Sequence, residues 1–159
     1  MLERLRQLAE DAAKLNSKLI LVVANAGGGK TDILSSFAES EGYPLVNVGR
    51  ELSRKLLSIP AMQRSVEVMP LLRDLIDQTK SEKCVILDNI EILFEEDLHI
   101  GPVDVLRKLA HARPLVAAWP GGFRDGRLTY ARTGHHEHCE VPLDGAVCPS
   151  SEHSAQLAA

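Results

Sequence analysis

The chain has 159 residues and a formal net charge of −4, from 18 basic and 22 acidic side chains. Apolar residues make up 45% and charged residues 25% of it, which is typical of a globular domain and excludes a disordered or collagen-like chain. The acidic balance excludes nucleic-acid binding over the whole surface, because phosphate binding needs a surplus of Lys and Arg. We predict one domain over residues 1–148 and a disordered tail over residues 149–159.

The cysteines and the N-terminus indicate the cellular compartment. The three cysteines include no CxxC pair and suit a reduced, cytosolic protein better than a disulfide framework. The first fifteen residues, MLERLRQLAEDAAKL, are charged and amphipathic, unlike a signal peptide. The longest apolar run, Leu19 to Ala24, is too short to cross a bilayer. We therefore expect a cytoplasmic protein that makes no membrane contact.

Helical and strand patterns alternate along the chain. Apolar residues at helical spacing predict helices over residues 2–15, 30–40, 50–59, 62–80 and 102–109. Short apolar runs predict strands at 18–24, 44–48, 83–88 and 114–119, and LTYA (128–131), with HCEV (138–141) as a further candidate, supplies a fifth. The predicted fold class is α/β, with a parallel five-stranded sheet flanked by helices.

The segment ANAGGGKT at 24–31 carries the strongest chemical signal. It follows a buried strand and precedes a helix, which is the context of a phosphate-binding P-loop, although Ala24 stands where the pattern has its first glycine. Glycines let backbone N–H groups turn inward around an anion, and the helix N-terminus adds its positive end. Lys30 is expected to reach the β- and γ-phosphates of ATP, and the Thr31 hydroxyl to bind Mg²⁺. The residues expected around the nucleotide are Asn25, Ala26, Gly27, Gly28, Gly29, Lys30, Thr31 and Asp32.

An acidic residue is expected at the end of another buried strand, and KCVILDNIE (83–91) supplies it. Asp88 follows four apolar residues, which fits a Walker B aspartate that holds Mg²⁺ through water. The glutamate that normally comes next is replaced by Asn89, which can orient water but cannot accept its proton. Glu91 is a displaced candidate for the catalytic base, with a solvated helix residue as the alternative. Slow hydrolysis, or hydrolysis only within an assembly, follows from this replacement.

The spacing of the two motifs favours one class of P-loop protein. After the helix that the P-loop begins, a full strand and two helices come before the second motif. This suits AAA-type ATPases, where a further strand is inserted between the two motif strands. The fourth predicted strand ends in Trp119 rather than in a polar γ-phosphate sensor, and packing is the favoured role of this indole. Arg124 and Arg127 are the candidates for an arginine finger, with Arg132 and Arg113 behind them. A finger that acts on a neighbouring subunit implies a homo-oligomer, here of an AAA-like core without a helical lid.

Beyond these motifs, the chain resembles a known family. ANAGGGKT, LDNIEILF and a later W-P-G…LTYA…GHHEH block are similar to the small P-loop proteins of type 3 BREX phage-defence systems, over residues 18–138. The resemblance implies an AAA-like ATPase of a bacterial anti-phage system that combines DNA methylation with a block of phage replication. It also implies other BREX components, and DNA, as partners.

Several alternatives stay open. HHEHC at 135–139 contains zinc-ligand types at a spacing typical of no zinc site, and a polar C-terminal strand is the favoured interpretation. The basic residues between Arg113 and Arg132 are a candidate contact for DNA phosphates, against ordinary surface charge. Asn89 and the missing lid allow a nucleotide-gated scaffold or DNA-binding adaptor with little turnover. A small-molecule phosphotransferase is the third function, and a sheet order that separates the motif strands would argue against it.

Overall fold

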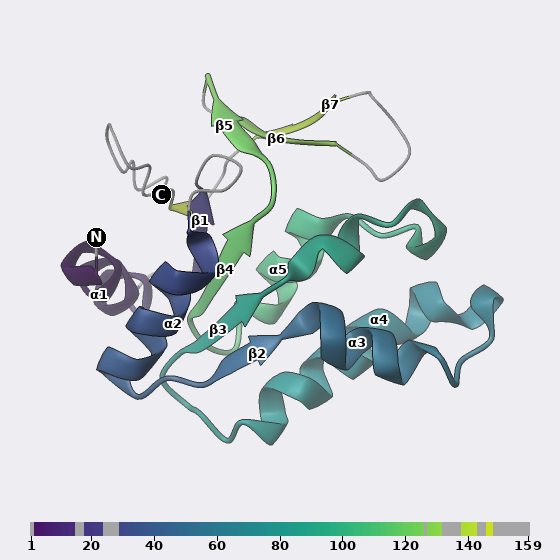
Figure 1. Ribbon diagram of the computed structural model, residues 1–159, viewed down its shortest axis with the longest axis horizontal. Coiled ribbons are helices and arrows are strands. Elements are labelled where there is room, and N and C mark those ends of the chain that lie inside the picture. Colours follow the sequence, from purple (N-terminus) through teal and green to yellow (C-terminus); the bar gives the residue numbers. More distant parts are fainter. Residues whose placement is uncertain are drawn as a thin grey trace.

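The computed structural model describes residues 2–14, 18–23, 29–125, 127–131, 138–142 and 146–147. Four parallel strands form its central sheet in the order β2-β3-β4-β1 (Figure 1). Their bounds are β1 Leu19–Val23, β2 Leu45–Asn47, β3 Val85–Asp88 and β4 Leu115–Trp119. A two-residue segment, β8 (Ala146–Val147), pairs in parallel with the outer edge of β1. The expected insertion of a strand between the two motif strands is confirmed, because β4 lies between β1 and β3.

Helices cover both faces of this sheet. One face carries α1 (Leu2–Ala12) and α2 (Lys30–Glu41), and the other carries α3 (Val48–Leu56), α4 (Ala61–Gln78) and α5 (Pro102–Leu109). Alternate side chains of each strand point to opposite faces, so Leu19 and Leu21 of β1 join one core cluster while Ile20 and Val22 join the other. All five residues of β1 and of β4 are buried, as expected for strands covered on both sides.

The prediction of a five-stranded parallel sheet is wrong in its fifth strand. LTYA lies in β6 (Arg127–Ala131), which pairs antiparallel with β5 (Gly122–Arg124) and with β7 (His138–Pro142) in a separate three-stranded sheet. HCEV lies in β7 of that second sheet and is also absent from the parallel one. The physical reason is the connection: Arg124 pairs with Arg127, and strands joined by a two-residue turn are antiparallel. The Asp125–Gly126 dipeptide is the sequence signal for such a hairpin.

A cluster of three aromatic rings packs the second sheet against the first. Phe94, Trp119 and Tyr130 contact one another edge to face, with ring centroids 4.6 Å to 5.7 Å apart. The buried Trp119 indole also donates a hydrogen bond from Nε1 to the Thr129 carbonyl oxygen, at 3.2 Å. The prediction that Trp119 is a packing residue is therefore confirmed.

Gly121 lets the chain turn from the first sheet into the second. A Cβ atom at this position would lie 1.7 Å from the Thr129 carbonyl oxygen, so β6 could not approach as closely. The same carbonyl accepts the Trp119 hydrogen bond, and both contacts set the position of the β5–β6 hairpin beyond the carboxyl end of β4. Every helix among the described residues is too short or too polar to span a bilayer.

Candidate functional site

The described residues of the two motifs lie at the carboxyl edge of the parallel sheet. In open α/β sheets this edge is where ligands bind, near points where strand order reverses. The chain leaves β1 at Val23 toward α2 and leaves β3 at Asp88 toward a short 3₁₀ helix, η1 (Ile90–Phe94). With β4 between them, the ends of β1 and β3 are two strand spacings apart, about 10 Å.

The end of the glycine run and the start of α2 belong to the described residues. Gly29 has φ 68° and ψ 30°, a left-handed conformation that favours glycine, and its carbonyl accepts the first helical hydrogen bond from Ile33 N at 3.0 Å. Lys30 is half-buried, and the exposed Thr31 and Asp32 follow it in the first turn of the helix. The helix N-terminus therefore carries the Lys and Thr of the motif. Asn25, Ala26, Gly27 and Gly28 lie outside the described residues.

Asp88 ends β3 and is 4% exposed, which makes it the one buried charged residue of the described chain. Its Oδ1 accepts a hydrogen bond from the backbone N–H of Asn89 at 2.9 Å. Burying a carboxylate costs folding free energy unless hydrogen bonds or a cation compensate it. A buried carboxylate at this edge is chemically suited to hold Mg²⁺, directly or through water.

Asn89 and Glu91 follow Asp88 and are both exposed. Asn89 adopts φ 53° and ψ 51°, a left-handed conformation that asparagine tolerates better than most residues. Gly49, in the first turn of α3, lies against this turn, because a Cβ there would be 3.0 Å from the Asn89 carbonyl oxygen. The tight turn leads into η1, where Glu91 stands two residues beyond Asn89.

Arg113 lies at the opposite edge of the sheet from the hairpin that carries Arg124 and Arg127. Arg113 precedes β4 at the amino edge of the sheet, where its guanidinium donates hydrogen bonds to the Ser81 carbonyl oxygen and to Asp77 Oδ1, each at 2.9 Å. Arg124 of β5 and Arg127 of β6 come after β4 in the chain, and their backbones pair across the hairpin. The five residues of β4 separate the two groups, about 17 Å of chain. Arg132 lies outside the described residues.

No group of three or more His, Cys, Asp or Glu side chains in the described part of the chain is arranged to hold a metal ion. Residues 135–137 of the HHEHC segment, Cys148 and the tail at 149–159 lie outside the described residues, and β7 begins at His138. Cys84 is buried next to β3, and burial raises the pKa of its thiol to about 12. A thiol of that pKa is neutral near pH 7, so Cys84 is a packing residue rather than a nucleophile or metal ligand.

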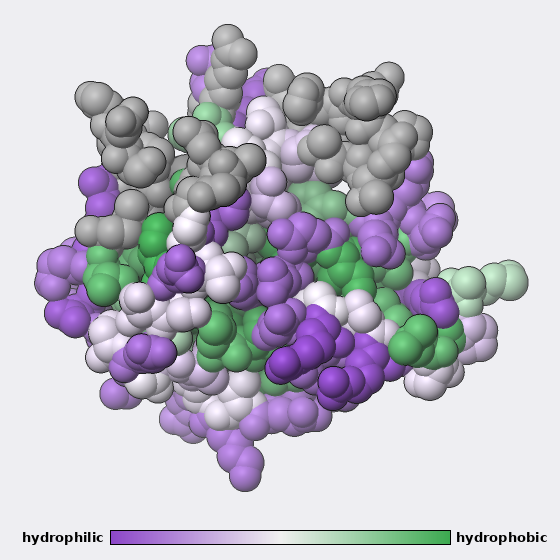
Figure 2. Space-filling view, viewed as in Figure 1, coloured by the Kyte–Doolittle hydropathy of each residue, from purple (hydrophilic) through white to green (hydrophobic). Residues whose placement is uncertain are grey.

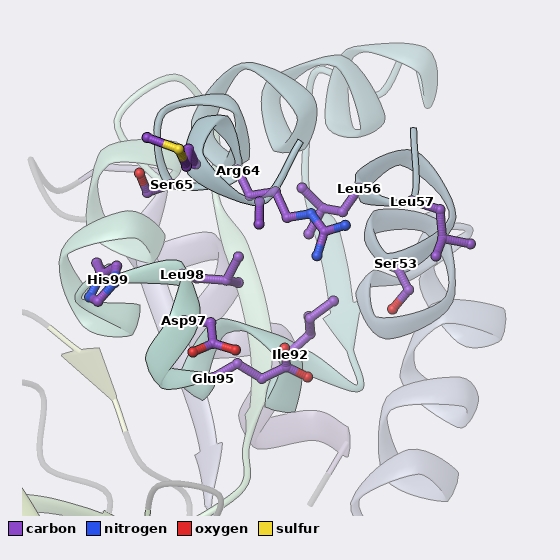
Figure 3. Close-up of a pocket in the computed structure, with 12 residues that line it drawn as sticks. Ser53, Leu56, Leu57, Arg64, Ser65, Ile92, Glu95, Asp97, Leu98 and His99 are labelled. Carbon is purple, nitrogen blue, oxygen red and sulfur yellow. The ribbon is translucent and has the colours of Figure 1, made fainter. Parts of the chain in front are cut away.

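A cavity of about 730 Å³ lies between α3, α4 and the segment that begins in η1 (Figure 3). Sequence patterns missed it, because its lining comes from three segments that only the fold brings together. Its lining includes exposed Leu57 and Met62, and exposure of large apolar residues cannot be read from helical spacing alone.

Two comparisons with known proteins found no relative. No model of a known protein family matches the chain, and no curated protein matches it significantly.

Proposed function

We propose that the chain is an AAA-like P-loop module that binds ATP with Mg²⁺ at the carboxyl edge of the parallel sheet. The observation that supports this most strongly is the sheet order, which puts Lys30 at the helix start after β1 and Asp88 at the end of β3, with β4 between them. The order argues against a small-molecule phosphotransferase, in which the two motif strands are usually neighbours.

Each candidate residue has its own role in this proposal. Backbone N–H groups of residues 25–30 and the α2 N-terminus bind the phosphates, and the Lys30 ammonium neutralises the β- and γ-phosphate charge. Thr31 and Asp88 hold Mg²⁺, which would supply charge neutralisation at the transferred phosphoryl group. Asn89 orients the attacking water, and Glu91 is the nearest exposed carboxylate along the chain to take its proton.

A nucleotide-gated scaffold or adaptor with little turnover is the second candidate. It is favoured by Asn89, which stands where a catalytic carboxylate would be and has no proton-accepting group. Robust ATP turnover by the isolated chain would exclude it.

The binding proposal is tested by titrating ATP with Mg²⁺ into the wild type, Lys30→Ala and Asp88→Ala. We expect Lys30→Ala to weaken ATP binding at least tenfold, and Asp88→Ala to abolish the strengthening of binding by Mg²⁺. Lys83→Ala is the matched control, because Lys83 is exposed at the amino edge, ahead of β3. Unchanged ATP affinity in Lys30→Ala would overturn the proposal.

The assembly and its biological setting are further parts of the proposal. Arg124 and Arg127, on the hairpin beyond β4, act as fingers on the nucleotide of a neighbouring subunit, so the chain assembles as a homo-oligomer when ATP and Mg²⁺ are present. Sedimentation with and without ATP and Mg²⁺ tests this, and a mass that stays monomeric counts against it.

The sequence resemblance supports a role in type 3 BREX anti-phage defence, with other BREX components and DNA as partners. Plaque counts in a host that carries the complete defence genes should rise when Lys30→Ala replaces the wild type. Equal protection by both chains would contradict this role.

A further inference from the structure

The 730 Å³ cavity is an open groove with an apolar floor. Leu56 of α3 and Leu98 of η2 (Glu96–Leu98) are buried at its base, and half-buried Ile92 of η1 lies beside them (Figure 3). Leu57 and Met62, at the connection between α3 and α4, also line it. We call this surface the α3–α4 groove.

Large apolar side chains are unusually exposed beside the groove. Leu57 is 81%, Met62 94% and Val66 68% exposed, and these three are the most exposed large apolar residues of the described chain. Figure 2 shows hydrophobic surface over the region where Figure 1 places the connection from the end of α3 to the start of α4. Scattered exposed apolar residues are common, but a cluster beside a groove marks a binding surface.

One bank of the groove is acidic. Glu91, Glu95, Glu96 and Asp97 are all exposed on the segment from η1 to η2, and Glu95 and Asp97 line the groove. Within the described part of the chain, none of the ion pairs involves Glu91, Glu95 or Asp97. Their negative charge is therefore directed at solvent.

Arg64 is the arginine that lines the groove, and two arginines of α3 outside its lining form ion pairs within the chain. Arg50 and Arg54 of α3 pair with Glu51, at 3.1 Å and 4.0 Å. Arg64 extends into the groove, and its Nε donates a hydrogen bond to the Ile59 carbonyl oxygen at 3.0 Å. The carboxylates of Glu95 and Asp97 outnumber Arg64 along the groove, so a positively charged partner is the complementary one.

We propose that the α3–α4 groove docks an amphipathic helix of a partner protein. Apolar residues of that helix, spaced i, i+3, i+4 and i+7, contact the floor and the exposed Leu57 and Met62, while its Lys and Arg residues face Glu95 and Asp97. DNA does not suit this groove, because its phosphates would meet the acidic bank. The proposal goes beyond nucleotide binding and does not depend on it.

Neither α1 nor α5 of a second copy suits the groove. The apolar stripe of α1 is already buried through Leu5 and Leu8, and that of α5 through Leu106 and Leu109. Docking either helix would expose apolar residues that are now in the core, so the proposed occupant is a helix of another protein.

The test is an unbiased peptide selection. A displayed library of peptides of about 16 residues, long enough for four helical turns, is selected on the immobilised full chain and counter-selected on the Glu95→Lys/Asp97→Lys double variant. We expect the enriched peptides to share helical apolar spacing with flanking Lys or Arg. Synthetic copies are then titrated by fluorescence anisotropy, at low and high salt.

Matched variants locate the binding. Affinity should fall at least tenfold in the double variant and in Met62→Asp, and should stay within twofold in Met62→Leu and in Glu82→Lys, which changes an exposed acid at the amino edge. The proposal is overturned if no peptide is enriched, if the enriched peptides lack basic residues, or if the variants bind as the wild type does. Concentration-dependent self-association that Met62→Asp abolishes would also overturn it, because the occupant would then be a second copy.

Discussion

The amino and carboxyl edges of the parallel sheet are built on different principles. At the amino edge, Arg113 ties the loop before β4 to the loop before β3, through the Ser81 carbonyl, and to Asp77 of α4. At the carboxyl edge, Asp88 is buried and accepts a hydrogen bond from the adjacent backbone, and the next residue is left-handed.

This difference separates stability from function. At the amino edge, Arg113 donates hydrogen bonds to Ser81 and Asp77, and such bonds add to the free energy of unfolding. The buried charge of Asp88 lies at the carboxyl edge beside left-handed Asn89, although Lys80 at the amino edge is left-handed too. A buried charge is typical of functional sites that other interactions keep folded. The aromatic cluster of Phe94, Trp119 and Tyr130 and the β5–β6 hairpin supply that support.

The largest expected effect comes from removing an aromatic ring at the carboxyl edge. Phe94→Ala should lower the free energy of unfolding by about 3–5 kcal/mol, because it leaves a cavity between Trp119 and Tyr130. Urea unfolding measures this value. Phe123→Ala is the control, since Phe123 is only partly buried, and its loss should be clearly smaller. Equal losses would mean that the aromatic cluster has no special structural role.

Gly121→Ala should destabilise the fold by about 3 kcal/mol, at the upper end of overpacking costs, because the new methyl group meets the Thr129 carbonyl. Gly42→Ala separates this clash from backbone strain. Gly42 has φ 68°, but no atom lies within 4 Å of the position that a methyl group would take, so only about 1 kcal/mol should be lost there. Thermal unfolding measures both variants. An equal loss of stability in Gly42→Ala and Gly121→Ala would contradict the steric argument.

The comparison of the two edges is sharpest in one pair of variants. Arg113→Ala should cost about 1–2 kcal/mol, because it removes two charge-assisted hydrogen bonds, of which the one to the exposed Asp77 is weakened by solvent. Asp88→Asn should change stability by less than about 1 kcal/mol, or raise it, because it removes a buried charge. A large loss of stability in Asp88→Asn would make Asp88 a structural residue. The two edges of the sheet would then no longer differ in this respect.

The smallest expected effect concerns the ion pair that joins α1 to α2. Arg6 donates to Glu41 at 2.7 Å, and this bond holds the pKa of the Glu41 carboxyl below its ordinary value. The stabilisation is therefore present above the ordinary pKa of a glutamate and is lost as the pH falls through the lowered value. The melting temperature of Arg6→Gln, compared with wild type, should differ slightly near pH 7 and converge at low pH. A difference that grows on acidification would contradict this sign.

Local patterns were enough to predict the elements of the parallel sheet. Val85–Asp88 and Leu115–Trp119 are buried throughout because helices cover both faces of each strand. Their nearly uninterrupted runs of apolar residues predict this burial. The start of α2 at Lys30 also follows from the sequence, because Gly29 supplies the left-handed residue that precedes it. Proline is most common in the first turn of a helix, but Pro70 lies in the middle of α4. Its position therefore does not mark the start of that helix.

The sequence by itself determined the apolar strands, the helix starts and the order in which Lys30 and Asp88 occur. The motif spacing favoured an inserted strand, but only the tertiary structure decided that β4 is that strand. It alone also decided that LTYA leaves the parallel sheet, and that Arg113 lies at the other edge from Arg124 and Arg127. Burial and helix propensity act over a few residues and leave a local pattern. Strand order and grooves depend on contacts between residues far apart in the chain, which no local pattern encodes.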